Sequence, residues 1–159
     1  MSRTQLLLDA MAGDIRSYLR MCGYDTVYVN DDSIEDLPGA LSTDPPDSEI
    51  VSAVEATGRR LVTRDYQLAQ QCSNTITLTT TETSARLSTL QEAGVCFKIE
   101  SSPTYCGVCN GSLERAAVGN APAYVADSID RCWSCNRCEQ YFWKGSHWEQ
   151  VKQTLHHID

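Results

Sequence analysis

Short apolar runs alternate along residues 1–101 with segments whose apolar residues recur at helical spacing. The apolar runs predict five strands, which are Leu6–Leu8, Thr26–Val29, Leu61–Thr63, Thr75–Leu78 and Val95–Ile99. The segments between them predict helices over 15–21, 47–57, 66–72 and 81–93, whereas the acidic, proline-containing stretch 30–46 predicts a loop with a helical turn at most. Strands that alternate with helices build βαβ units, so the pattern indicates an α/β fold with a mostly parallel sheet.

Three aspartates occupy positions where catalytic groups collect in such folds. Asp9 directly follows the first predicted strand. Asp47 opens, and Asp65 closes, the stretch DSEIVSAVEATGRRLVTRD, which runs from a helix into a strand. Polar groups at the carboxyl ends of neighbouring strands face the ligand crevice, and clustered carboxylates need a cation such as Mg²⁺ or Mn²⁺. The alternative is that each aspartate only caps a helix or ends a strand.

Two CxxC pairs follow residue 101, where the hydrophobic periodicity fades. Cys106 and Cys109 form the first pair, and the second is either Cys132 with Cys135 or Cys135 with Cys138. In an intracellular protein, this spacing predicts a tetrahedral zinc site with four cysteine ligands. Four protein ligands leave no position for water, so the zinc is expected to be structural and to hold together a segment too small to build its own core.

An aromatic run, Tyr141–Trp148, follows the second pair. Its aromatic rings, together with Lys144 and His147, could stack on and neutralise single-stranded nucleic acid. The alternative is that the rings only pack the zinc-binding segment against the sheet, and both roles can hold. The glycine after the lysine allows a tight turn, which would place Lys144 and His147 on one side while Trp143 and Trp148 face inward.

Composition narrows the classes of protein that remain. The chain of 159 residues is 42% hydrophobic, which is enough for a packed core, and it has no apolar run of the roughly 20 residues that span a membrane. The N-terminus lacks the features of a signal peptide, so we expect an intracellular, cytoplasmic protein. A net charge of −8 argues against a general polyanion binder. Ten arginines against three lysines suit a halophilic protein. The three isolated cysteines, Cys22, Cys72 and Cys96, are expected to be buried thiols.

Three groups of motifs stand in a characteristic order. They are LLLDAMAG with LRMCGYDT, then DSEI with GRRLVTRD, and then CxxCN with CxxC and YFWKGSHW. From about Leu6 to Trp148 this order resembles the Mut-seven C-terminal RNase domain, a branch of the PIN-type ribonucleases that carries a zinc ribbon. The resemblance implies a three-layer α/β/α sandwich over residues 1–101, with the zinc ribbon and a C-terminal helix over 102–159. It also implies that Asp9, Asp47 and Asp65 bind Mg²⁺ or Mn²⁺.

The same resemblance selects the zinc ligands and shows one departure from the family. Alignment at WKGSHW selects Cys135 and Cys138 as the second pair, which leaves Cys132 as an extra cysteine. The first helix of the family is usually basic from its start. Here, Asp14 and Ser17 stand at two of those positions, while Arg20 is retained. These two residues reduce the positive charge that the resemblance leads us to expect at the RNA-contacting surface.

Taken together, these features predict a metal-dependent endoribonuclease that cleaves single-stranded RNA. Arg20, Arg64, Lys144 and His147 are the predicted substrate contacts, although Arg64 could equally be a surface arginine. One alternative is an RNA- or ribosome-associated binding module that keeps the fold but cuts slowly or not at all. Another is an interaction protein whose ribbon docks a partner. Metal-dependent cleavage separates the first hypothesis from the other two.

Overall fold

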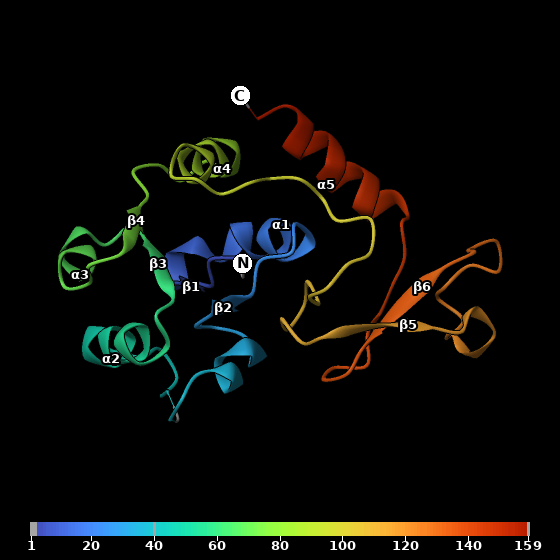
Figure 1. Ribbon diagram of the computed structural model, residues 1–159, viewed down its shortest axis with the longest axis horizontal. Coiled ribbons are helices and arrows are strands. Elements are labelled where there is room, and N and C mark those ends of the chain that lie inside the picture. Colours follow the sequence, from blue (N-terminus) through green and yellow to red (C-terminus); the bar gives the residue numbers. More distant parts are fainter. Residues whose placement is uncertain (1–2, 40, 159) are drawn as a thin grey trace.

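Four parallel strands form the centre of the computed structural model, which describes residues 3–39 and 41–158 (Figure 1). Strand β1 (Leu6–Leu8) pairs with β2 (Thr26–Tyr28) on one side and with β3 (Arg60–Thr63) on the other, and β4 (Thr75–Thr77) pairs with β3. The strand order is therefore β2-β1-β3-β4. The mostly parallel sheet predicted from the sequence is confirmed.

Side chains alternate along each strand, so the sheet has two apolar faces. Helices cover both of them. Leu6 and Leu8 point into one apolar cluster, which also contains residues of η1 (Ala10–Ile15), α1 (Arg16–Met21), α4 (Thr83–Glu92) and α5 (Ser146–His156). Leu7 points into the other, which contains residues of α2 (Asp47–Thr57) and α3 (Tyr66–Gln70). The predicted three-layer sandwich is confirmed, and the layers are visible in Figure 1.

The fifth predicted strand, Val95–Ile99, is wrong. Its apolar residues do alternate, and Val95, Phe97 and Ile99 pack against the first core cluster. However, the backbone N–H of Cys96 donates to the hydroxyl of Tyr24, and the N–H of Glu100 donates to the carbonyl of Met21. The segment therefore crosses the helical layer as an extended chain without joining the sheet.

Local sequence signals explain the helix that leads into β3. α2 begins at Asp47, after Pro46 in the N-cap position, and ends before Gly58, whose φ of 72° lies in the left-handed region. Glycine adopts this conformation without steric cost, so Gly58 terminates the helix as predicted. The loop 30–46 contains one helical turn, η2 (Asp32–Asp36), among its described residues.

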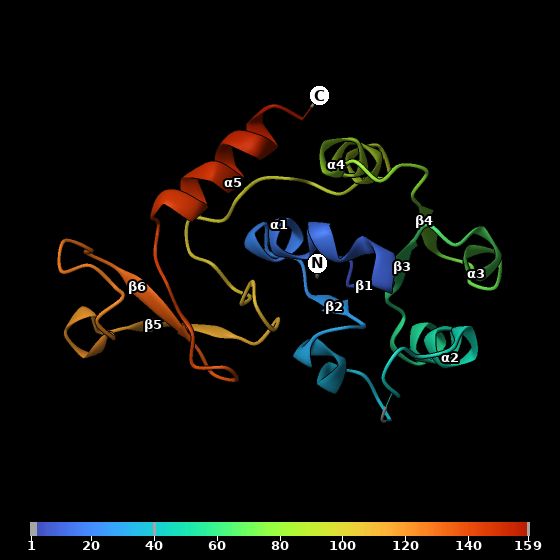
Figure 2. The same ribbon diagram turned by 180° about the vertical axis from the view of Figure 1, so that it is seen from behind.

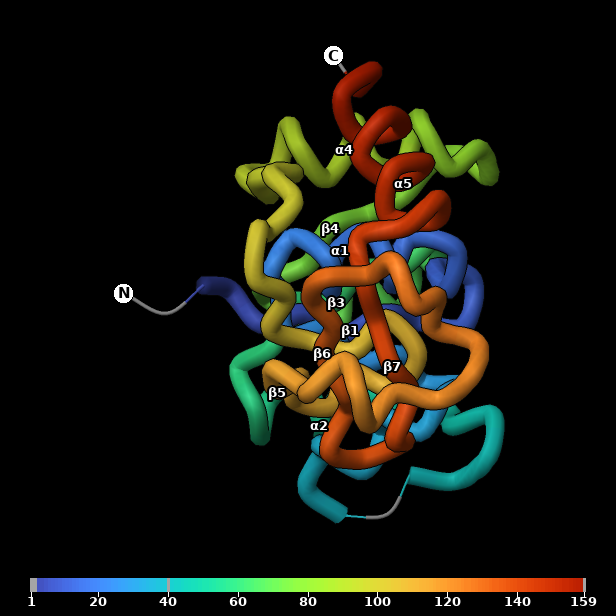
Figure 3. The backbone as a smooth tube through the Cα atoms, turned by 90° about the vertical axis from the view of Figure 1, so that its right-hand side faces the viewer, coloured from blue at the N-terminus to red at the C-terminus, as the bar shows by residue number. Residues whose placement is uncertain are grey.

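A second, antiparallel sheet lies in the segment that carries the two CxxC pairs, and this segment is called the ribbon below. β6 (Cys132–Cys135) lies between β5 (Leu113–Ala116) and β7 (Tyr141–Phe142), and η3 (Val118–Asn120) follows β5. The ribbon lies beside α1 and β2 (Figure 2), and it faces the viewer in Figure 3, where α5 leads from it toward α4. Val151, Leu155 and Ile158 from the C-terminal segment pack in the first core cluster. The last helix, predicted with the ribbon, thus completes the core of residues 1–101.

Polar contacts fasten the ribbon to β2, an edge strand of the parallel sheet. The amide of Asn110 accepts a hydrogen bond from the backbone N–H of Thr26 at 3.0 Å and donates to the carboxylate of Asp25 at 2.7 Å. Arg137 forms an ion pair with Asp36. Asn110 has a φ of 67°, a left-handed conformation that asparagine tolerates better than most residues. In the described part of the chain, no helix is long and apolar enough to cross a membrane.

Candidate functional site

Two of the predicted catalytic aspartates lie at the point where the strand order reverses. From β1 the chain passes to β2 on one side, and from β3 it passes to β4 on the other. Asp9 follows the last residue of β1, and Asp65 lies two residues after the end of β3. Ligands of open α/β sheets bind outside the carboxyl ends of the strands at such a reversal. The topology therefore places Asp9 and Asp65 in the position expected of an active site.

Thr63, a buried residue at the end of β3, joins these two aspartates. Its hydroxyl donates to Asp9 Oδ2 at 2.7 Å and accepts a hydrogen bond from the backbone N–H of Asp65 at 2.9 Å. Asp65 Oδ1 in turn accepts from the N–H groups of Gln67 and Leu68 and caps α3. Both carboxylates are thus held in fixed orientations, and the capping role that the sequence left as an alternative is also present.

Asp47 is exposed in the first turn of α2, where the helix dipole favours a negative charge. Within the described residues, Asp9, Asp47 and Asp65 form no ion pair, whereas Asp14, Asp25, Asp31 and Asp36 each pair with an arginine. The three carboxylates are hard oxygen donors of the kind that Mg²⁺ and Mn²⁺ prefer. They are not grouped as tightly as a ready-made ion site, so their joint ligation stays a prediction.

Arg20 and Arg64 differ in what their side chains can reach. Arg20 is 0% exposed, and its guanidinium donates to the carbonyl oxygens of Thr26 and Gly107 and pairs with Asp31 at 3.0 Å. No part of that guanidinium is open to a phosphate, so the structure does not support the predicted RNA contact of Arg20. Arg64 is exposed beside Asp65, and its contact with RNA stays a prediction.

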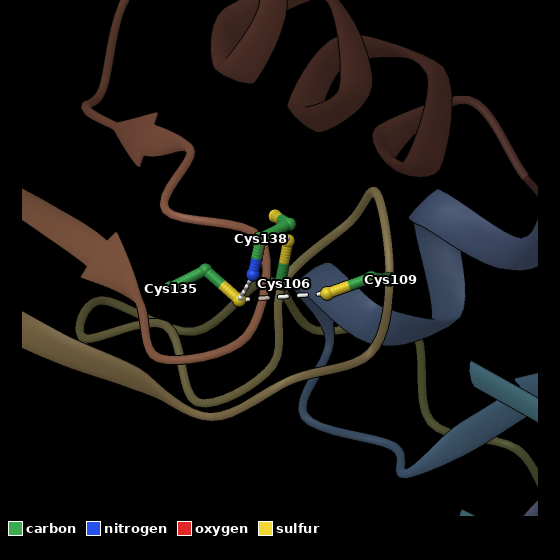
Figure 4. Close-up of side chains that lie close together, drawn as sticks. All are labelled: Cys106, Cys109, Cys135 and Cys138. Atoms are coloured by element: carbon green, nitrogen blue, oxygen red, sulfur yellow. Dashed lines mark hydrogen bonds between the residues drawn. The ribbon is translucent and has the colours of Figure 1, made fainter. Parts of the chain in front are cut away.

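The four predicted zinc ligands converge in the ribbon (Figure 4). The Sγ atoms of Cys106, Cys109, Cys135 and Cys138 lie within 4.8 Å of one another, with 3.6 Å between Cys106 and Cys138 and 3.4 Å between Cys109 and Cys135. Zinc–sulfur bonds of about 2.3 Å in a tetrahedron require sulfurs about 3.8 Å apart. The sequence alone left Cys132 open as a ligand. Its Sγ lies 3.7 Å from the carbonyl of Ala116 instead.

The chemistry of the four thiols also fits a zinc ion. Burial raises the pKa of Cys109 to about 11 and raises that of Cys106 as well. Burial acts in the same direction on Cys135, but hydrogen bonds from the N–H groups of Cys138 and Arg137 and from the Cys109 and Cys138 side chains together lower its pKa. Zinc binding requires these thiols to ionise, and a cation among the four sulfurs would offset the cost of burying the thiolates. Their N–H···S hydrogen bonds orient the sulfurs that would hold it.

A cavity of about 360 Å³ lies where the ribbon meets α1 and the start of α5. Lys144 and His147 are exposed and line it, together with Trp143 and Trp148. Trp148 is only half-buried, which differs from the inward packing that we expected. Gly145 has an ordinary φ of −101°, so no left-handed turn is involved. Glycine suits this position because a Cβ would lie 2.5 Å from Trp143 Nε1 and would displace that ring.

Comparison with known proteins gives one match. A sequence model of the Mut7-C RNAse domain family matches residues 4–155, nearly the whole chain. The chain belongs to the Mut7-C RNAse domain family. No curated protein and no solved structure matches it. Membership confirms the resemblance that the motifs predicted and indicates a ribonuclease-type function.

Two features of this Mut7-C domain explain what sequence reasoning missed. Asp14, at a position where the resemblance implied a basic residue, accepts hydrogen bonds from Arg86 at 2.6 Å and from the hydroxyl of Thr83 at 2.7 Å. It thereby ties η1 to α4. Thr63 was not predicted as a site residue. The sequence feature that could have indicated Thr63 is a hydroxyl residue at the end of an apolar strand, directly before Arg64 and Asp65.

Proposed function

We propose that this Mut7-C domain is a divalent-metal-dependent endoribonuclease that cleaves single-stranded RNA at the carboxyl edge of the parallel sheet. The observation that carries the proposal is the pair Asp9 and Asp65, held through Thr63 at the reversal of strand order. A ribonuclease family and carboxylates that have no basic partner among the described residues support it.

Each residue of the edge has a distinct part in this proposal. Asp9, Asp47 and Asp65 would hold Mg²⁺ or Mn²⁺, which when bound supplies an activated water and neutralises charge on the phosphate. Thr63 donates to Oδ2 of Asp9 and the N–H of Ala10 donates to Oδ1, so both oxygens keep a fixed direction. The N–H groups of Gln67 and Leu68 hold Asp65 through Oδ1 alone and leave Oδ2 for the ion.

Basic residues on the surface would hold the RNA. Arg64 lies beside Asp65 and would contact a phosphate near the scissile bond. Lys144 and His147 are exposed on the ribbon side and would contact the strand farther along. We place the activity in the cytoplasm, where the reducing environment keeps the four zinc-binding thiols reduced.

A second candidate is an RNA-binding module with weak or no cleavage. It is favoured by the loss of positive charge on the first helical segment, where Asp14 is committed to Arg86 and Arg20 is buried. A net charge of −8 adds to the repulsion of RNA. Binding without metal-dependent cleavage would distinguish this candidate.

The decisive experiment is cleavage of a labelled single-stranded RNA in a titration of Mg²⁺ and Mn²⁺. We expect Asp9→Asn, Asp47→Asn and Asp65→Asn each to reduce the rate at least tenfold. Asp44→Asn is the matched control, because Asp44 is exposed near Asp47 and asparagine tolerates its φ of 53°. Cleavage that persists without divalent ions, or at full rate in Asp65→Asn, would refute the proposal.

A further inference from the structure

All three tryptophans of the chain line one cavity, the space of about 360 Å³ between the ribbon and α1. Trp133 comes from β6, Trp143 follows β7, and Trp148 lies in α5. Val108, between the first two zinc ligands, also lines the cavity and is 53% exposed. The cavity is therefore open to solvent, and its size falls in the range of about 300–1,000 Å³ that is typical of small-ligand pockets.

Among the described residues that line this cavity, Lys144 is the one lysine or arginine, in a protein with a net negative charge. None of the described residues that line it is acidic, although the chain carries a net charge of −8. The ammonium groups of Lys144 and Lys152 lie 5.2 and 5.1 Å from the centroid of the Trp148 ring. Two of the chain's three lysines thus stand over one tryptophan. On the ribbon, Arg115 lies 6.0 Å from the ring of Trp133.

Flat aromatic faces beside positive charges suit a ligand that combines an aromatic ring with an anion. We infer that this cavity binds one unstacked nucleobase of a single-stranded RNA, with the adjoining phosphate against Lys144. Stacking on aromatic side chains accepts any base, because every base has a π-face. The inference rests on the proposed RNA substrate and adds a second binding site, since none of the three aspartates lines the cavity.

The cavity lies close enough to the parallel sheet for one RNA strand to reach both the cavity and Asp9. Ser17 of α1 lines the cavity and lies eight residues after Asp9 along one helical segment. At about 1.5–2.0 Å of rise per residue, that segment spans at most about 16 Å. A base held in the cavity would therefore fix the RNA a few nucleotides from the carboxyl edge. The cavity would set the distance between an anchored base and the bond that is cut.

Intrinsic fluorescence tests this inference directly, because all three tryptophans report on the cavity. The complete chain is titrated with hexameric oligoadenylate and with an abasic hexamer of equal charge, in buffer without Mg²⁺ or Mn²⁺. We expect oligoadenylate to quench the fluorescence. The abasic hexamer should bind about 5- to 150-fold more weakly, since base stacking contributes that factor per base.

Two variants fill the cavity without removing a packed ring, Val108→Phe and Gln140→Phe. In each, the Kd for labelled oligoadenylate, measured by fluorescence anisotropy, should rise at least fivefold, with unchanged zinc content and melting temperature. Val118→Phe is the matched control, because Val118 lies on the same ribbon but does not line the cavity.

Equal affinity for the natural and abasic hexamers, or an unchanged Kd in both folded filling variants, would overturn the inference. Base-dependent binding that the filling variants weaken supports it, even if no RNA is cleaved. That last result would refute the proposed endoribonuclease activity alone. Cleavage without base-dependent binding would instead refute the inference and leave the activity standing.

Discussion

Replacing Arg20 with lysine separates an architectural role of this residue from a role in RNA binding. The guanidinium of Arg20 donates to the carbonyl of Thr26 at 2.9 and 3.0 Å, to the carbonyl of Gly107 at 3.0 Å and to the hydroxyl of Ser33 at 3.1 Å. It also pairs with Asp31 at 3.0 Å. It therefore joins α1, β2 and the first zinc-binding loop from a fully buried position.

Lysine keeps the positive charge opposite Asp31 but lacks the planar fork that reaches several acceptors at once. At least one buried carbonyl would lose its charged donor, and such a hydrogen bond contributes about 1.5–3 kcal/mol. We expect Arg20→Lys to lower the free energy of unfolding by roughly 2–4 kcal/mol, a large share of the 5–15 kcal/mol typical of a domain.

Urea denaturation followed by circular dichroism measures this loss, with the slope against urea checked for constancy. Arg64→Lys is the matched control, because Arg64 is exposed, and it should change stability by less than about 0.5 kcal/mol. Where both proteins are folded, Arg20→Lys should bind RNA within about twofold of the unaltered chain. An unchanged stability together with tenfold weaker RNA binding would show that Arg20 contacts substrate and that our reasoning is wrong.

Three further outcomes follow from the zinc centre, the carboxyl edge and a buried thiol. Cys138→Ser should lose zinc and Cys132→Ser should keep it, because only Cys138 lies in the sulfur cluster; metal analysis showing the reverse would disprove this ligand set. Mg²⁺ or Mn²⁺ at about 100 times its Kd should stabilise the fold by about 2.7 kcal/mol, and an equal gain in Asp65→Asn would count against the ion site. Burial raises the pKa of Cys22 from 9.0 to about 12. The unfolded thiol therefore ionises first, and stability should fall above pH 9.0 by up to about 1.4 kcal/mol per pH unit. Cys22→Ala should reduce this slope, and identical slopes would exclude the thiol as its cause.

Most of the sheet could be predicted because its strands are short apolar runs between amphipathic helices. The run Val95–Ile99 has the same pattern but does not pair. Alternation shows only that one side of a segment is buried, and it does not show whether a neighbouring strand offers hydrogen bonds. Here the partners are the hydroxyl of Tyr24 and the carbonyl of Met21, which no local pattern reveals.

Some residues of the candidate sites could be predicted from short sequence motifs, whereas others depend on contacts between residues far apart in the sequence. CxxC spacing is local, so it predicted a cluster of four cysteines, and the family motif selected Cys138 in place of Cys132 as its fourth member. The family resemblance made Arg20 an RNA contact, because its contact with the carbonyl of Gly107, 87 residues away, cannot be read from the local sequence. Thr63 acquires its role only when β1 and β3 become neighbours.

The hydrogen bond from Thr26 to Asn110 has a consequence for the behaviour of copies of this chain toward one another. β2 is an outer strand, and an unpaired N–H on such a strand invites a strand from another molecule. Asn110 accepts from that donor only while the loop after Cys106 keeps its shape, in which the N–H of Asn110 donates to the carbonyl of Cys106. If a metal ion binds the four clustered cysteines, its removal should therefore open this sheet edge and favour pairing between copies of the chain. Bound metal would in this respect oppose self-association.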